Sequence, residues 1–181
     1  MATHTAPVTV EEFLRFPEVE GRKRELIDGE IVEKPMALHA HDLVKNNIAE
    51  ALVVFTQRQR GWIVCVETEF RLDDLNDVFP DVAVVDRAAY YAADRSSRYP
   101  HAPYVAIEVV SSEKASELER KIGVYFRAGT RAVIVAYPEL KEILVRRPDG
   151  SGSMFSEGQT FRDELLPGLA VDAGEFFAGL S

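Results

Sequence analysis

Two short segments that combine polar and hydrophobic residues on either side of a turn predict a β-hairpin near the start of the chain. Residues 24–27 and 30–33 each have the pattern of a short strand, and Asp28-Gly29 separates them. Asp-Gly is a favoured two-residue turn between antiparallel strands, because its backbone twist matches theirs. Pro35 follows the second strand and should end it, since proline cannot donate a hydrogen bond to a neighbouring strand.

Hydrophobic residues recur at helical spacing in two long segments, residues 40–60 and 115–126. Gly61 and Gly129 follow these segments, and glycine commonly ends a helix. The two hydrophobic stripes consist of Val44, Ile48, Leu52 and Phe55, and of Ala115, Leu118, Ile122, Tyr125 and Phe126. Each stripe should face a buried core. A shorter helix is predicted at 9–16, before the hairpin.

Four further segments carry nearly uninterrupted hydrophobic residues, which is typical of strands buried on both faces of a sheet. They are 62–66, 81–85, 104–110 and 132–137. Residues 67–72 should continue the first of these strands or pair with it. The last two strands and the helix between them form a βαβ unit, in which the strands run parallel and the crossover is right-handed.

The remaining segments complete a mixed α/β protein. Residues 142–147 and 153–156 flank a Pro-Asp-Gly turn and predict an antiparallel edge of the sheet. A short helix is expected within the loop at 86–102, and a last one at 172–180. The fold class is therefore α/β, with a mixed central β-sheet flanked by α-helices and an N-terminal hairpin. The whole chain of 181 residues is expected to form a single domain.

Composition and charge limit the classes of function. Hydrophobic residues make up 46% and charged residues 28% of the chain, so wholesale disorder is excluded. The 21 basic and 30 acidic residues leave a net charge of −9, which argues against tight non-specific DNA binding but permits a local metal site. Cys65 is the only cysteine, which excludes an intramolecular disulfide and cysteine-built zinc or iron–sulfur cages. No secretory signal or membrane span is visible, which predicts a cytoplasmic protein.

Two carboxylates interrupt strands that otherwise consist of buried residues. Asp81 opens one strand and Glu108 lies within another. An isolated buried carboxylate is costly, so each should have a basic side chain, backbone N–H groups or a divalent metal as a partner. Two carboxylates on adjacent strands suit Mg²⁺ or Mn²⁺. The alternative is that each side chain reaches solvent at the end of its strand.

Four other polar residues are weaker candidates for the same site. Lys121 borders the hydrophobic stripe of its helix, although a solvent-exposed ion pair with Glu117 is the simpler interpretation of a single lysine. Glu25 and Glu69 could each add a carboxylate, or be exposed strand residues. His41 could contact a phosphate or act as a base, or be a polar residue at a helix start.

The order of these pieces resembles a known family. Along the chain they are Glu25–Glu30, His41, Pro80–Val85, Glu108–Ser111, and Lys121 with Tyr125, Ala128 and Gly129. This ordered set, spread from about Thr9 to Leu169, is similar to the large bacterial family of putative restriction endonucleases within the PD-(D/E)xK nuclease superfamily. The resemblance implies a restriction-endonuclease-like fold and a metal-dependent endonuclease that hydrolyses phosphodiester bonds in DNA.

The resemblance also implies roles for individual residues. Asp81 matches the superfamily aspartate, and Glu108 matches the acidic residue on the next core strand. Val110 occupies the usual lysine position two residues after that acid, and Lys121 on the following helix matches the displaced lysine of this family. Glu25 matches an acidic residue near the same site.

The implied cofactor is Mg²⁺, or Mn²⁺, bound by Asp81 and Glu108 with the Val109 carbonyl as a further ligand. Such a metal lowers the pKa of bound water and polarises the phosphate. Lys121 would orient or deprotonate the water, or stabilise the developing charge. The hypothesis requires the two carboxylates and the lysine to converge within about 8 Å.

DNA is the expected partner. A strip of basic residues should contact it, consisting of Lys114, Arg120, Arg127 and Arg131. Cutting both strands leads us to expect a homodimer or higher homo-oligomer. Two alternatives stay open. One is a catalytically silent relative that acts as an oligomeric binding or scaffold module, and the other is the same chemistry on RNA.

Overall fold

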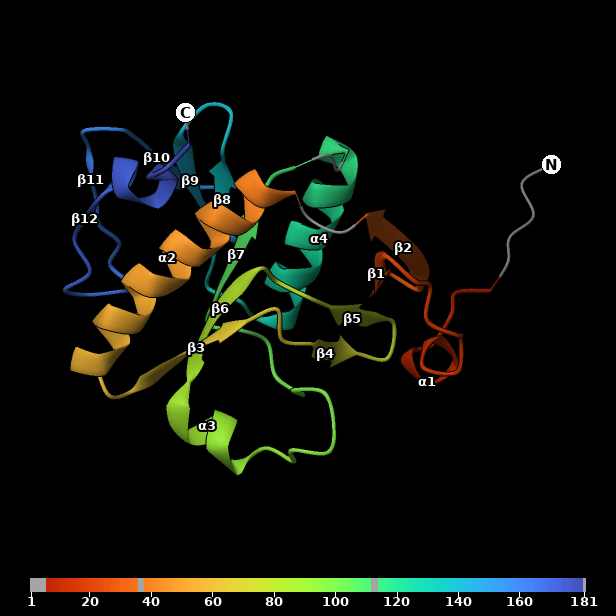
Figure 1. Cartoon of the computed structure of the whole chain (residues 1–181). Coiled ribbons are helices and arrows are strands. Elements are labelled where there is room, and N and C mark those ends of the chain that lie inside the picture. Colours follow the sequence, from red (N-terminus) through yellow and green to blue (C-terminus); the bar gives the residue numbers. More distant parts are fainter. Residues whose placement is uncertain (1–5, 36–37, 112–113, 181) are drawn as a thin grey trace.

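A computed structural model of the chain describes residues 6–35, 38–111 and 114–180 (Figure 1). Its largest component is a six-stranded sheet with the strand order β10-β9-β8-β7-β6-β3. The strands are β3 (Trp62–Val66), β6 (Val82–Asp86), β7 (Val105–Val109), β8 (Ala132–Tyr137), β9 (Glu142–Arg146) and β10 (Gly152–Ser156). Strands β7 and β8 pair in parallel, and the other neighbouring pairs are antiparallel. The mixed sheet and its βαβ unit therefore agree with the prediction.

Two helices, α2 (His39–Arg58) and α4 (Ala115–Ala128), cover opposite faces of this sheet (Figure 1). Side chains alternate between the faces along each strand, so Ile107 packs in the cluster with α2 and Ala106 in the cluster with α4. The predicted stripe on α2 is buried, and each of its large side chains contributes about 1.5–3 kcal/mol to folding. Strand β7 is buried along its whole length, as a central strand covered on both faces should be.

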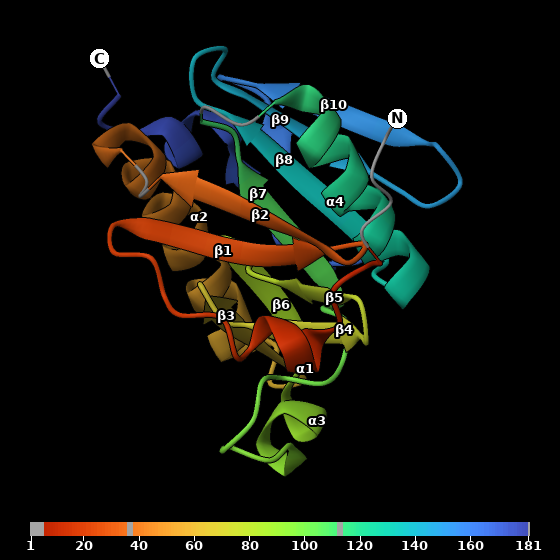
Figure 2. The ribbon, with the colours of Figure 1, turned by 90° about the vertical axis from the view of Figure 1, so that its right-hand side faces the viewer.

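A second, four-stranded sheet packs against the α4 side of the large sheet, with the order β2-β1-β5-β4. Its strands are β1 (Arg22–Ile27), β2 (Glu30–Pro35), β4 (Phe70–Asp73) and β5 (Asn76–Val78). The prediction that residues 67–72 continue the strand at 62–66 or pair with it is wrong. Glu67 has a φ of 47°, and this left-handed residue redirects the chain into the small sheet. Figure 2 shows β1 and β2 in front of the large sheet, beside α4.

Smaller elements complete the fold. They are α1 (Val10–Phe13), α3 (Arg87–Ala92), the paired strands β11 (Thr160–Phe161) and β12 (Val171–Asp172), and a 3₁₀-helix, η1 (Ala173–Phe177). The first helix is shorter than the predicted 9–16, the loop helix forms as predicted, and the last helix is 3₁₀ rather than α. Within the described ranges, no helix is both long and hydrophobic enough to cross a membrane.

The hairpin turn at Asp28-Gly29 requires its glycine. Both residues have positive φ, 51° at Asp28 and 74° at Gly29, which is the geometry of a tight hairpin turn. A side chain at Gly29 would also collide with Pro7, whose neighbour Val8 donates a backbone hydrogen bond of 2.8 Å to the Gly29 carbonyl. The turn therefore anchors the segment before α1 as well as joining β1 to β2.

We expect Gly29→Ala to destabilise the protein by about 1–2 kcal/mol through backbone strain, with a further loss from the collision with Pro7. Gly150→Ala is the matched control, because Gly150 has a φ of 84° but a Cβ there would have no atom within 4 Å. Urea denaturation measures the free energy of unfolding of both variants. Equal losses would contradict the importance of the contact with Pro7.

Candidate active site

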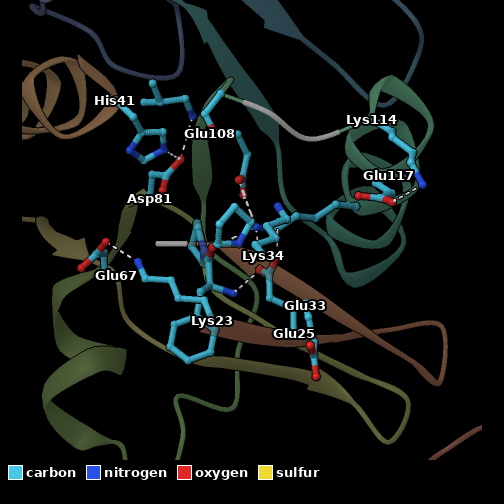
Figure 3. Close-up of a pocket in the computed structure, with 16 residues that line it drawn as sticks. Lys23, Glu25, Glu33, Lys34, His41, Glu67, Asp81, Glu108, Lys114 and Glu117 are labelled. Carbon is cyan, nitrogen blue, oxygen red and sulfur yellow. Dashed lines mark hydrogen bonds and ion pairs between the residues drawn. The ribbon is translucent and has the colours of Figure 1, made fainter. Parts of the chain in front are cut away.

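Two neighbouring strands bring Asp81 and Glu108 to the same face of the large sheet. Val82 of β6 pairs with Ile107 of β7 in antiparallel register, so the next position places Asp81 opposite Glu108. Residues directly opposite one another in such a pair project from the same face, here the face that α4 covers. Both carboxylates line one cavity of about 280 Å³ (Figure 3).

A buried lysine, Lys121 of α4, lies beside Glu108. Its Nζ is 2.9 Å from Glu108 Oε1 and donates a hydrogen bond of 3.0 Å to Oε2. Tyr125 lies one helical turn further and donates its hydroxyl to Glu108 Oε1 at 2.7 Å. All three side chains are buried. Helix α4 therefore holds both oxygens of Glu108 in fixed positions.

Glu25 of the hairpin reaches the same lysine from the small sheet. Glu25 Oε1 lies 2.6 Å from Lys121 Nζ and accepts a hydrogen bond of 2.7 Å from the Phe79 backbone N–H. Lys121 in turn donates to the Phe79 carbonyl at 2.9 Å. The ion pair therefore binds both the backbone N–H and the carbonyl of Phe79, and this fixes the chain just before Pro80 and Asp81.

Asp81 is positioned by a histidine and by the strand next to it. Its Oδ2 accepts hydrogen bonds from His41 Nε2 at 3.1 Å and from the Val109 backbone N–H at 2.8 Å. His41 comes from the first turn of α2, so the helix on the other face of the sheet also contributes to the cavity. Figure 3 shows His41 and Asp81 facing each other.

Burial and neighbouring charges shift the pKa values of Glu108, Glu25 and Lys121 by different amounts. Burial raises the pKa of Glu108 to about 7, and the charges of Asp81 and Glu25 add to the rise against the opposing effect of Lys121. Burial also opposes ionisation of Glu25, but the charges of Lys121 and Lys34 and the hydrogen bonds from Lys121 and Phe79 together outweigh it and lower the pKa of Glu25. Burial disfavours a charged Lys121, yet Glu108 and Glu25 raise its pKa above the usual value. The lysine therefore stays protonated.

The Asp81–His41 pair favours its charged forms. Burial raises the pKa of Asp81, but the hydrogen bond and charge of His41 outweigh this effect and lower it. Burial disfavours a protonated His41, but the hydrogen bond and charge of Asp81 raise the pKa of the imidazole above its ordinary value. Each member of the pair therefore favours the charged form of the other.

Two buried polar atoms of the cavity lack a hydrogen-bond partner within the described part of the chain. They are Glu25 Oε2 and His41 Nδ1. Glu25 Oε2 is 3.3 Å from Lys34 Nζ, and His41 Nδ1 is 3.6 Å from Asp42 Oδ1, so both have charge partners but no hydrogen bond. Buried polar atoms left in this state are uncommon and mark positions where a ligand or water could bind.

The charges around the cavity favour a cation. The lining includes six carboxylates and four lysines, so negative charge is in excess. In the described residues no three His, Cys, Asp or Glu side chains form a ready-made metal cage. Mg²⁺ does not need one, because it commonly binds one or two carboxylates and keeps several waters. The oxygen donors of Asp81, Glu108 and Val109 fit that requirement.

The structure brings most of the predicted site residues together. Those at the cavity are Glu25, His41, Asp81, Glu108, Val109 and Lys121. Glu69 is apart from them, because its carboxylate binds Arg98, outside the cavity lining. The interpretation of Lys121 as a solvent-exposed partner of Glu117 is wrong, since the lysine side chain is only 2% exposed. Glu117 instead lies 3.6 Å from Lys114.

The predicted basic strip is partly neutralised. Arg120 forms an ion pair with Glu30, and Arg127 forms one with Asp28. These pairs tie the end of the hairpin to α4 rather than presenting free positive charge. Lys114, by contrast, lines the cavity and is 79% exposed. A DNA contact through the whole strip stays a prediction.

Sequence reasoning missed two contributors to the site. Tyr125 follows Lys121 by four residues, a helical spacing that places both side chains on one face, but its hydrophobic neighbours favoured a purely packing role. Lys34 pairs with Lys23 in the hairpin register, and Glu25 lies two residues further along β1. Alternation along the strands therefore places all three on one face of the hairpin, a signal that was available in the sequence.

Comparisons with known proteins identify the family and support the fold. The model of the Uma2 family, described as putative restriction endonuclease, matches residues 10–174. No curated protein matches the chain. A crystal structure of a putative nuclease belonging to DUF820 from Anabaena variabilis ATCC 29413 has the same fold. It superposes with a TM-score of 0.81 at 22% identity, over 94% of this chain and 98% of that chain.

Lys121→Met should destabilise the protein by about 3–5 kcal/mol, because it leaves Glu25 and Glu108 buried without their cation. The loss of the cation also raises the pKa of both carboxyls in the folded state. A carboxyl whose pKa is higher in the folded than in the unfolded state stabilises the folded protein as the pH falls. The loss in the free energy of unfolding should therefore be smaller at about pH 5.5 than at about pH 7.5.

Chemical denaturation at the two pH values measures this effect. Lys114→Met is the control on the same helix, since Lys114 is exposed and should lose little stability at either pH. Similar losses in the two variants would contradict a central role for the buried lysine.

Proposed function

The chain belongs to the family of putative restriction endonucleases, and from this premise we propose that it is a metal-dependent endonuclease that hydrolyses phosphodiester bonds in DNA. The observation that carries the proposal is the convergence of Asp81, Glu108 and Lys121 on one cavity. Burying ion pairs usually adds little stability compared with hydrophobic packing. A cluster of this kind is therefore more readily explained by chemistry than by folding.

Asp81, Glu108 and the Val109 carbonyl would hold a divalent ion, Mg²⁺ or Mn²⁺, since all three donors are oxygens and two carry charge. When bound, such an ion lowers the pKa of a bound water and offsets charge on the phosphoryl oxygens. The protein prepares the donors in advance. His41 and the Val109 N–H orient Asp81, while Tyr125 and Lys121 orient Glu108.

The raised pKa of Lys121 favours one of the roles open to this residue. A lysine that stays protonated cannot remove a proton from water. Its three N–H groups are already directed at Glu25, Glu108 and the Phe79 carbonyl. The fixed positive charge can stabilise negative charge that develops on the phosphate with little reorganisation. We therefore assign Lys121 to electrostatic stabilisation and to positioning of the Glu108 carboxylate.

DNA is the proposed substrate, and the cytoplasm is the proposed place of action. One cavity of this kind can attack one strand at a time. Cleavage of both strands would take two copies, so we propose that the protein acts as a homodimer or higher homo-oligomer.

Glu108→Gln and Asp81→Asn should each lower the cleavage rate by about 10²-fold or more, because each removes a charged donor at the reacting centre. Glu69→Gln is the control, since Glu69 binds Arg98 outside the cavity and should cleave at the wild-type rate. Nicking and linearisation of supercoiled plasmid measure the rates, and circular dichroism checks that each variant folds. Wild-type rates in both cavity variants would overturn the site.

Removal of divalent ions with EDTA should abolish cleavage, and added Mg²⁺ or Mn²⁺ should restore it, because the oxygen donors suit these ions. The same plasmid assay, with single-stranded DNA and RNA in parallel, tests metal and substrate together. Cleavage that persists in EDTA would contradict metal dependence. A wild-type protein that binds DNA but cuts no substrate with any metal would favour the catalytically silent alternative.

A further inference from the structure

A carboxylate joins two lysines at the edge of the cavity. Glu67 Oε1 accepts hydrogen bonds from Lys23 Nζ on β1 and, at 3.0 Å, from Lys45 Nζ on α2. Lys45 is also held by Asp42 at 2.8 Å. Figure 3 shows Glu67 and Lys23 facing each other on the side of the cavity away from Lys114 and Glu117. The contact bridges the two walls of the cavity, the hairpin and α2.

The Glu67 carboxylate is more exposed to solvent than Lys45, the more buried of its two lysine partners. The Glu67 side chain is 37% exposed, Lys23 is 29% exposed and Lys45 is only 8% exposed. Glu67 and Lys23 line the cavity, whereas Lys45 contacts Glu67 without lining it. A ligand that enters from solvent therefore meets Glu67 before it meets Lys45.

The position of Glu67 makes the carboxylate a candidate for displacement. The Glu67 backbone N–H bonds the Asp81 carbonyl at 3.2 Å, so this turn stays attached to the catalytic segment whichever way the side chain points. If the side chain turned away, Lys45 would still be held in place by Asp42.

We propose that Lys23 and Lys45 form a binding site for a backbone phosphate of the substrate, and that Glu67 occupies this site when the substrate is absent. A carboxylate and a phosphodiester each spread one negative charge over two oxygens. Lysine ammonium groups bind both as compact charges. A phosphate could therefore replace Glu67 between the two lysines without any other change in their positions.

The inference deepens the proposed function and rests on it, because the site shares its cavity with Asp81 and Glu108. A phosphodiester at these carboxylates would place a neighbouring phosphate of the same strand near the mouth of the cavity. The anion site would then hold the strand in position. It also explains how a protein with a net charge of −9 could bind a polyanion, since local lysines are uncovered only by the correct ligand.

The test compares DNA affinity in variants of the bridge. Fluorescence anisotropy with a short labelled duplex, in EDTA to prevent cleavage, gives the dissociation constant at several NaCl concentrations. Glu67→Gln should bind the duplex about tenfold more tightly, because two partly exposed ion pairs no longer compete. Glu33→Gln is the matched control, since Glu33 also lines the cavity and is 41% exposed. It should show only the small gain that follows from removing one negative charge.

Lys23→Met provides the second arm. It should weaken binding and reduce the slope of log affinity against log salt by about 1, as expected for one lost phosphate contact. In this background Glu67→Gln should give a much smaller gain, because one of the two competing pairs is already absent. Thermal unfolding of each variant confirms that the proteins compared are folded.

The outcomes separate the phosphate site from the nuclease activity. Unchanged or weaker binding by Glu67→Gln, or a gain equal to that of Glu33→Gln, would overturn the phosphate site and identify Glu67 as a structural link. Wild-type cleavage could still be observed in that case. Tighter binding by Glu67→Gln with no cleavage under any metal condition would support the phosphate site and overturn the proposed endonuclease. Absence of DNA binding in every variant would overturn both.

Discussion

The buried ion pairs of Lys121 are the constraint on which the rest of the site depends. Their two acidic partners come from different sheets, Glu25 from the small one and Glu108 from the large one. The lysine between two buried carboxylates has no low-energy alternative position, and its removal would leave both carboxylates without their cation in a medium of low polarity. The arrangement therefore fixes how the hairpin docks against α4. It also fixes Phe79, and through Phe79 the approach of the chain to Asp81.

Local patterns were enough to predict most elements. The Asp-Gly turn, the stripe on α2 and the βαβ unit at 104–137 each report contacts between nearby residues or a regular periodicity, and each is confirmed. The division into two sheets was not predictable in this way. It depends on strands of only three or four residues and on the left-handed backbone conformation of Glu67. No sequence pattern around a glutamate predicts that conformation. The prediction of a short helix at 9–16 was wrong about where the helix ends, and helix boundaries are where sequence signals are weakest.

The family was recognisable from an ordered set of short pieces, and the family match over residues 10–174 confirms it. The convergence of the predicted residues was harder to predict than the family, because no local signal in the sequence relates Glu25, Asp81 and Lys121. The structure places them at one cavity, but it separates Glu69 from it. Glu69 and Glu67 are only two residues apart in the sequence, and the direction of each depends on how the chain turns between β3 and β4. Periodicity alone could not decide which of them borders the cavity.

Two ion pairs between the hairpin and α4, Arg120 with Glu30 and Arg127 with Asp28, join segments that leave the ribosome at very different times. The hairpin is among the first parts of the chain to be synthesised, and α4 follows only after five further strands. Contacts of such high sequence separation carry a loop-closure cost and slow folding. A nascent or truncated chain that lacks α4 therefore carries Glu25 and Glu108 without Lys121, so the cavity stays incomplete until the helix has been synthesised.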